Sequence, residues 1–276
     1  MTWFELLIAS FSYGFMWRAL LVGVAIAVTS SFIGPFLVLK KFSMIGHGLS
    51  HVAFAAVAIG LFTRTEPLIV TMVIVVIVSV FILKLNQSTN IHGDAAIGLT
   101  AAFAMAFGTV LASVGGGFNI DLFSYLFGSI LTIQRIDVIL SISLSVIVII
   151  VVVLLYHDLF AMTFEEEYAR VVGIKTKRLN TVLAVLVGMT IVIGMRAIGT
   201  ILISSLIIFP TVIAMQFNRG FRGTILIAVI SSVLIVTFGL FGSFVLDYPS
   251  GSSIVLFNGI VFFGIFLFNR IRRLRY

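Results

Sequence analysis

The stretch PLIVTMVIVVIVSVFILKL, residues Pro67–Leu85, carries no charged side chain before Lys84. As an α-helix it is long enough to cross the roughly 30 Å hydrocarbon core of a bilayer. Across all 276 residues, 61% are hydrophobic and only 10% are charged, against roughly a quarter charged in ordinary soluble domains. This small number of charged side chains cannot cover a water-exposed surface. The sequence therefore predicts a membrane protein.

Similar apolar stretches recur along the chain, separated by short polar gaps. They predict an all-α, polytopic transmembrane helical bundle that forms one domain over residues 1–276. Eight or nine spans are expected, because only Arg196-Ala197 separates the sixth stretch from the seventh. The candidate spans are Phe15–Leu39, Met44–Phe62, Pro67–Leu85, Ala95–Ser113, Ile136–Tyr156, Thr181–Met195, Ile198–Phe217, Gly223–Leu246 and Ser252–Phe268.

The cations indicate how the bundle is oriented. Lysine and arginine resist translocation and collect in cytoplasmic gaps, and 13 of the 17 fall on one side of the predicted map. This distribution predicts an extracytoplasmic N-terminus and a cytoplasmic C-terminus in the cell membrane of a bacterium. Topology then accounts for the net charge of +7, and no nucleic-acid partner is expected. In the extracytoplasmic gap Gly115–Arg135, the short apolar run Phe123–Ile130 is expected to dip into the membrane.

The sequence offers no residues for an enzyme. It has no cysteine, which removes thiol catalysis and thiolate metal sites together. Gly173-Ile174-Lys175-Thr176 has an ending similar to that of a phosphate-binding loop but lacks the upstream loop that wraps phosphate. We therefore expect no bound cofactor, and any nucleotide hydrolysis is expected on another chain.

A histidine pair stands at the start of the second span, in Met44-Ile45-Gly46-His47-Gly48-Leu49-Ser50-His51. Residues four apart share one face of a helix, so both imidazoles can reach one metal ion. Two ligands are too few for a zinc site. The small residues around the pair let helices approach closely in lipid, so a second copy of the chain is expected to complete the site. His92 and His157, which lie in polar gaps, are instead expected to be solvated loop residues.

The gap His157–Asn180 is the largest on the cytoplasmic side. Thr163 is placed to cap a short amphipathic helix near residues 164–174, acidic residues follow at its positive end, and Gly173 is placed to end it. The pattern predicts a helix lying along the membrane surface.

Three groups of residues, taken together, resemble a known family. They are Gly34-Pro35 with Leu37–Gly46 and Leu49-Ser50-His51, the segment Glu167–Arg170 with Gly173-Ile174, and Gly199–Leu202 through Pro210 to Ala214. In their order and spacing they resemble the permease subunits of zinc and manganese ABC importers, the ABC-3 family.

The resemblance implies an ATP-driven importer of divalent transition-metal ions, with the ion as transported substrate. It implies three kinds of partner: cytoplasmic ABC ATPase subunits, an extracytoplasmic metal-binding protein and a second copy of the chain. It implies that Glu166, Glu167, Ala169, Arg170 and Gly173 belong to a helix that couples to the ATPase. His51 matches a metal-binding position of the family, whereas His47 stands where relatives usually have aspartate. Nitrogen in place of oxygen favours zinc over manganese.

Two alternatives remain at this point. One is a secondary metal transporter driven by an ion gradient, which commonly needs carboxylates at mid-membrane. The other is an ABC permease for iron chelates or vitamin B12, which would not need a histidine pair.

Overall fold

The computed structural model describes residues 12–88, 93–115 and 133–273. The predicted membrane-dipping run 123–130 and His92 lie outside these residues. Within the described ranges the chain forms helices and no strand. The helices are α2 (Gly14–Leu39), α3 (Ile45–Phe62), α4 (Pro67–Ser88), α5 (Gly93–Val114), α7 (Arg135–Leu154), α8 (Tyr156–Phe164), α9 (Glu166–Val171), α10 (Thr176–Ile198), α11 (Thr200–Met215), α12 (Gly220–Leu246) and α13 (Ser250–Arg273).

Eight described helices are long and apolar enough to cross a membrane, namely α2, α3, α4, α5, α7, α10, α12 and α13. The ninth candidate, α11, has 16 residues. It is therefore about 24 Å long, shorter than the roughly 30 Å hydrocarbon core. The predicted all-α membrane bundle is confirmed.

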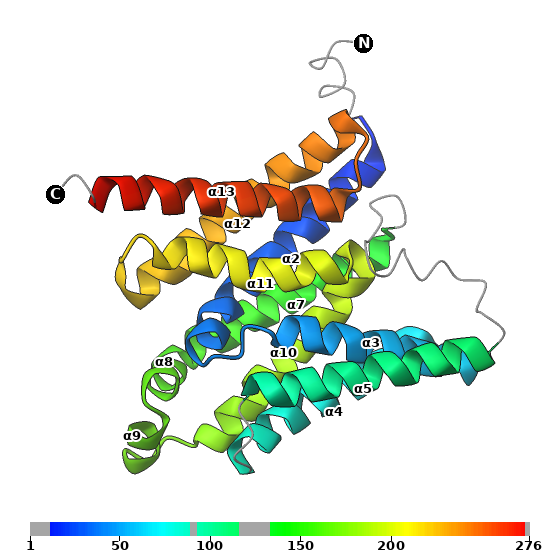
Figure 1. Ribbon diagram of the computed structural model, residues 1–276, viewed down its shortest axis with the longest axis horizontal. Coiled ribbons are helices and arrows are strands. Elements are labelled where there is room, and N and C mark those ends of the chain that lie inside the picture. The colour runs from blue at the N-terminus through cyan, green and yellow to red at the C-terminus, as the bar shows by residue number, and fades with distance from the viewer. Residues whose placement is uncertain (1–11, 89–92, 116–132, 274–276) are drawn as a thin grey trace.

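The boundary between α10 and α11 differs from the predicted one. Arg196 and Ala197 lie inside α10, and the chain breaks at Gly199, whose φ is 87°. This left-handed region favours glycine, because a Cβ would be strained there. After Gly199, α11 runs back through the bundle beside α13 (Figure 1).

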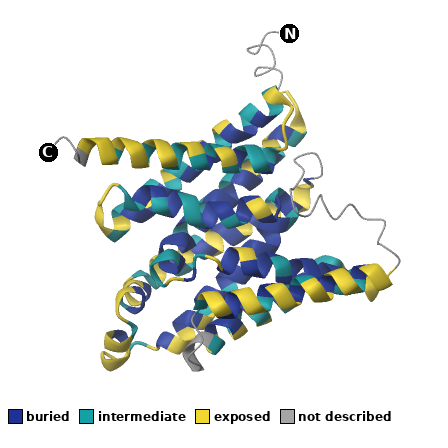
Figure 2. Cartoon of the chain, viewed as in Figure 1, coloured by how far each residue is buried: buried dark blue, intermediate teal, exposed yellow. Residues whose placement is uncertain are grey.

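The buried residues concentrate on the central helices (Figure 2). In α2, α3 and α10, 72% of the residues in the most apolar 18-residue stretch are buried, against 17% in α13 and 22% in α5. The outer helices expose large apolar side chains, such as Phe103 at 74%. A bilayer accepts such a surface because lipid is as apolar as these side chains.

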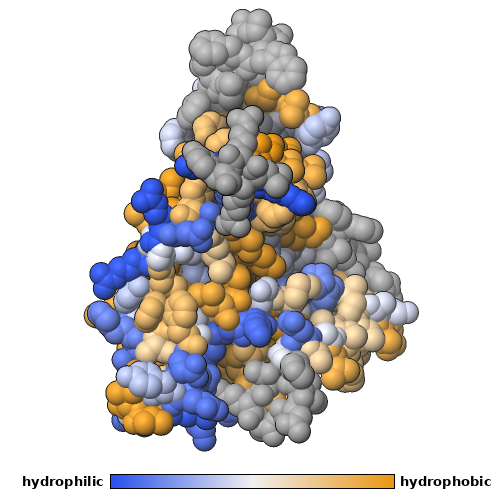
Figure 3. Space-filling model, turned by 60° about the vertical axis from the view of Figure 1, so that its left-hand side comes forward, coloured by the Kyte–Doolittle hydropathy of each residue, from blue (hydrophilic) through white to orange (hydrophobic). Residues whose placement is uncertain are grey.

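The helices run between two ends of the bundle. In Figure 1 the α8 and α9 helices, the turn between α11 and α12 and the end of α13 lie on the left, whereas the turn between α12 and α13 lies on the right. Figure 3 brings the left-hand end forward and shows hydrophilic side chains gathered there, with hydrophobic patches between them.

Close backbone contacts join α2, α3 and α11. A Cβ on Gly34 of α2 would lie 2.5 Å from the carbonyl oxygen of Ile207 in α11. A Cβ on Gly46 of α3 would lie 3.2 Å from Cδ1 of the same isoleucine. Glycine at position 34 is therefore required for the observed approach of α2 to α11. Glycine at position 46 likewise lets the start of α3 pack closely against α11.

An ion pair links α7 to the far end of α10. The Nε of Arg196 lies 2.9 Å from Oδ1 of Asp137, and the Asp137 side chain is 7% exposed. Asp137 also accepts a hydrogen bond from the backbone N–H of Gln134 through Oδ2. The buried carboxylate is thus compensated by a cation and by a helix cap.

Candidate functional site

A tight turn positions the histidine helix. Lys41, two residues after the end of α2, has a φ of 60°, the N–H of Phe42 donates to the carbonyl of Leu37, and the N–H of Lys41 donates to that of Val38. These two bonds form a Schellman motif, which ends a helix at a defined residue. The α3 helix then begins at Ile45, only a few residues after the end of α2.

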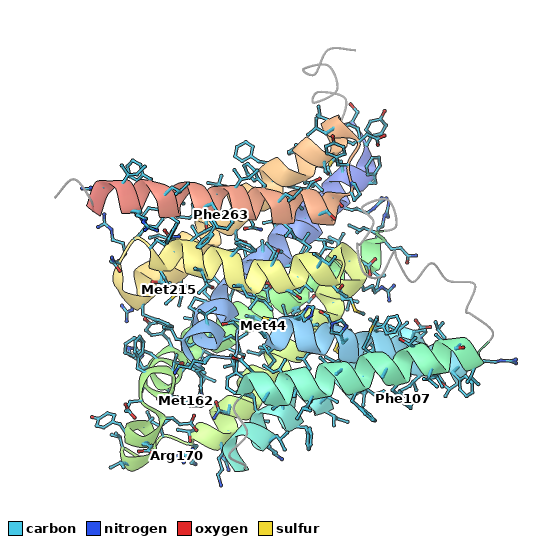
Figure 4. The ribbon with its side chains drawn as sticks, in the orientation of Figure 1. Met44, Phe107, Met162, Arg170, Met215 and Phe263 are labelled. Atoms are coloured by element: carbon cyan, nitrogen blue, oxygen red, sulfur yellow. The ribbon has the colours of Figure 1, made fainter. Side chains whose placement is uncertain are left out.

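His47 and His51 lie side by side on one face of α3. Their Nε2 atoms are 3.2 Å apart, and their rings meet edge to face with the centroids 4.6 Å apart. His47 is exposed and His51 is half-buried. Figure 4 labels Met44, three residues before His47, near the middle of the bundle in that view.

The separation of the two nitrogens suits a metal ion. Two nitrogen ligands at about 2.0–2.1 Å from a tetrahedral zinc ion lie about 3.3 Å apart, close to the observed 3.2 Å. The described residues contain no group of three or more histidine, cysteine or acidic side chains that could hold an ion. Within this part of the chain, the pair is therefore an incomplete ligand set that leaves coordination positions for other groups.

The small residues near the pair pack inside the chain. A Cβ on Gly48 would lie 2.5 Å from Cγ2 of Ile97 in α5, and Ala53 and Ala56 are fully buried. Gly46 faces α11, as described above. Helices α4, α5 and α11 of the same chain pack against this helix, so these small residues make close contacts within one chain, and the completion of the site by a second copy stays a prediction.

The predicted surface helix consists of two helices, α8 and α9. Glu165 separates them with an extended backbone, φ −149° and ψ 90°. Thr163 is not the cap, because it lies inside α8 and donates its hydroxyl to the carbonyl of Leu159. A threonine hydroxyl can bond the carbonyl four residues earlier instead of capping a helix.

Gly173 ends α9 as predicted. Its φ is 91°, its N–H donates to the carbonyl of Arg170, and the N–H of Ile174 donates to that of Ala169. This is the same Schellman pattern that ends α2. A Cβ on Gly173 would meet nothing within 4 Å, so its backbone conformation and not the available space calls for glycine.

Glu166 joins three segments of the chain. Its Oε2 lies 3.2 Å from Nζ of Lys40, and its Oε1 accepts from Nη2 of Arg170 at 2.7 Å. Nδ2 of Asn180 in α10 donates to the same Oε1, and Nζ of Lys40 donates to Oδ1 of Asn180. The cluster Lys40–Glu166–Arg170–Asn180 therefore ties α9 to the end of α2 and to α10.

Burial and charge act in opposite directions on this cluster. Burial raises the pKa of Glu166, but the hydrogen bonds from Arg170, Lys40 and Asn180 and the charge of Lys40 outweigh it and hold this pKa below its usual value. Burial lowers the pKa of Lys40 more than the Glu166 carboxylate raises it. The geometry of an ion pair supports both groups being charged near neutral pH.

The other residues predicted to couple to an ATPase divide between two faces of α9. Ala169 is fully buried and Arg170 is engaged by Glu166, whereas Glu167 is exposed. Tyr168 is 63% exposed and Val171 is 86% exposed. The outward face of α9 is therefore partly apolar.

Two members of the cluster were not among the predicted site residues. Lys40 contributed to the cation count and to the segment Leu37–Gly46 of the family resemblance, and Asn180 closed the gap after α9. Their position in the sequence could have indicated that they lie near Glu166, since each borders an apolar span at the same end of the bundle.

Comparisons with known proteins agree with this architecture. The family model described as the ABC 3 transport family matches residues 12–269. The high-affinity zinc uptake system membrane protein ZnuB of Haemophilus influenzae is 30% identical over 247 residues, which cover 90% of this chain and 95% of that protein. The manganese import system permease protein ScaB of Streptococcus gordonii is 28% identical over 250 residues, covering 91% and 90%.

A solved structure is also similar. PsaBC from Streptococcus pneumoniae in complex with Fab contains a chain that matches with a TM-score of 0.83 and 25% identity, covering 95% of this chain and 94% of that one. Together with the eight apolar helices, these matches identify a multi-pass protein of the bacterial plasma membrane. The chain belongs to the ABC 3 transport family.

Proposed function

We propose that this chain is the translocation subunit of an ATP-driven importer of divalent transition-metal ions, with zinc preferred over manganese. The observation that carries the proposal is the pair His47 and His51, whose nitrogens lie at a metal-chelating distance on one face of α3. Relatives named for zinc uptake and for manganese import support the class of substrate. The preference for zinc rests on the ligand atoms, since imidazole suits zinc and carboxylate suits manganese.

Two copies of the chain would complete the site. His47 is exposed, so a second copy can bring its own pair to the same ion and supply four imidazoles. An extracytoplasmic metal-binding protein would deliver the ion, and histidine ligation would offset its lost hydration. Release requires that this ligation be transient, because transport needs binding weak enough to let the ion leave.

Energy would enter through α9. Its exposed Glu167, Tyr168 and Val171 form a partly apolar face on a helix only six residues long, suited to a groove on a cytoplasmic ATPase. The cluster around Glu166 would pass a displacement of α9 to Lys40, at the turn that begins the histidine helix. This assignment places α8 and α9 in the cytoplasm and the N-terminus outside, in keeping with the cation distribution.

The secondary-transporter alternative has no support in the described part of the chain. Every carboxylate there lies at a helix end or in the α8–α9 segment. Coupling to an ion gradient commonly uses carboxylates in the middle of the membrane.

Metal content of cells tests the proposed function. A strain lacking the gene is compared with strains regaining the wild-type gene or the H51A form, with zinc and manganese measured together by mass spectrometry. The expected result is restored zinc with the wild type and no restoration with H51A at equal membrane abundance. Unchanged metal content on loss of the gene, in medium depleted of both metals, would contradict the proposal.

A further inference from the structure

A second hollow lies away from the histidine pair, where α2, α7, α8 and α12 meet. It is an open groove with a volume of about 490 Å³, within the roughly 300–1,000 Å³ of small-molecule sites. Neither its position nor its residues contribute to the proposed metal pathway.

The groove changes from polar to apolar along the helix axes. Arg222 lines it in the first turn of α12, and Val229 lines it seven residues later, which is about 10 Å deeper at 1.5 Å per residue. On α7 the lining Val152 and Val153 come just before the helix end, and His157 follows on α8. The polar rim thus lies at the helix ends and the apolar floor extends toward the middle of the bundle.

The cation at the rim is held in place without a carboxylate partner. The guanidinium of Arg222 lies 5.1 Å from the centre of the Tyr156 ring, a cation–π contact. Among the described residues, no carboxylate forms an ion pair with Arg222. Asp158, next to His157, is exposed. Arg222 is therefore available to an anion from outside the chain.

An aromatic cluster fixes the rim. Phe221, beside Arg222, packs against Phe36 of α2 at 5.0 Å and against Phe160 of α8 at 5.2 Å between ring centroids. Tyr156 also contacts Phe221, at 6.0 Å. The α8 helix is thereby held against α2 and α12, so the groove is built into the packing of the bundle.

We propose that this groove binds an anionic phospholipid, with its phosphate at Arg222 and His157 and one acyl chain along Val152, Leu226 and Val229. Two features select this occupant. The groove has the polarity of an amphiphile aligned with the helices, and it presents an uncompensated cation where basic pockets between membrane helices take anionic headgroups. Leu226 and Val153 are 61% and 60% exposed, so an acyl chain would cover apolar surface there.

Native mass spectrometry of the delipidated protein in detergent tests the proposal, with phosphatidylglycerol and phosphatidylcholine as probes. The wild type is expected to bind phosphatidylglycerol about tenfold more tightly than phosphatidylcholine, so that binding is seen at a lipid concentration about tenfold lower. R222Q should remove this preference and R222K should keep it. R219Q is the matched control, because Arg219 carries the same charge three residues earlier and does not line the groove. V229W, which fills the floor, should weaken both lipids.

Several results would overturn the proposal. They are an equal effect of R219Q and R222Q, equal binding of the two lipids to the wild type, or displacement of phosphatidylglycerol by millimolar glycerol phosphate, which would indicate a site for free phosphate.

The chain has no cysteine, so L226C introduces a single thiol. A disulfide-linked dimer of L226C in membranes would show that a second copy covers the groove. Lipid binding is measured without transport, so its failure leaves the metal proposal intact.

Discussion

The ammonium of Lys40 lies 3.2 Å from the carboxylate of Glu166, although 126 residues separate them in the sequence. Lys40 caps α2 at the start of the turn into the histidine helix, and Glu166 is the first residue of α9. The contact therefore connects the surface-exposed α9 to the end of α2, from which a short turn leads into the helix that carries His47 and His51.

Breaking this contact should destabilise the protein. The Lys40 side chain is 10% exposed and that of Glu166 is 24% exposed, so K40M or E166Q removes one partner of a charge that is partly buried. We expect each variant to lose about 2 kcal/mol, less than the roughly 3–5 kcal/mol of a fully buried pair, because Arg170 still pairs with Glu166 in K40M and Asn180 still accepts from Lys40 in E166Q. The double variant should lose less than the sum. Thermal unfolding in detergent measures the losses, and strict additivity would contradict a direct interaction.

The stability contributed by Glu166 should depend on pH. Its folded-state pKa is lowered, so the contribution is complete above the unfolded value of about 4.3 and is lost as pH falls through the lowered folded value. The difference in melting temperature between the wild type and E166Q is thus expected to be constant from about pH 6 to 7.5 and to shrink below about pH 4.3. A difference that grows on acidification would have the wrong sign.

Replacing Gly173 should affect coupling through backbone strain. G173A places a Cβ at a φ of 91°, at a cost of about 1–2 kcal/mol, and should shift α9 and weaken co-purification of the ATPase. Gly220 provides the control, because its φ is 68° and it too has open space around it, but it is the first residue of α12 and not part of α9. If G220A and G173A reduce co-purification equally, the effect is not specific to α9.

The histidine pair should set both transport and selectivity. H51A should abolish zinc uptake with assembly preserved, because at most two imidazoles per dimer would remain. H47D introduces the carboxylate that the family resemblance implies at this position and should keep transport while shifting the preference toward manganese, the harder ion. Uptake of both metals by cells producing equal amounts of each variant measures the shift. Normal zinc uptake by both H47A and H51A would make the pair structural.

The sequence was sufficient for features set by one segment at a time. An uncharged run such as 67–83 has to be helical in a bilayer because its backbone groups need partners. His47 and His51 share a face because of helical periodicity, and Gly173 ends α9 because of its conformational freedom. Each of these properties depends on neighbours within a few residues.

Features set by distant segments could not be predicted in this way. Nothing near Lys40 indicates that it meets Glu166, because that contact depends on how α2, α9 and α10 pack. Thr163 has the sequence environment of a cap, yet its hydroxyl bonds within α8 once Glu165 becomes extended. The small residues of α3 indicated close packing correctly, but periodicity alone does not reveal which helix approaches them.

Two neighbouring helices pack tightly against the start of the helix that carries the histidine pair. Ile207 of α11 closes over Gly46 and Ile97 of α5 closes over Gly48, so the backbone on either side of His47 has little room to shift. Packed interiors respond to strain by discrete rearrangement and not by gradual deformation. The backbone positions that carry the two imidazoles, whose Nε2 atoms lie 3.2 Å apart, are thereby held in place. On the proposed function, an ion bound by this pair would be released by withdrawal of the ligands on its opposite side, and not by separation of His47 from His51.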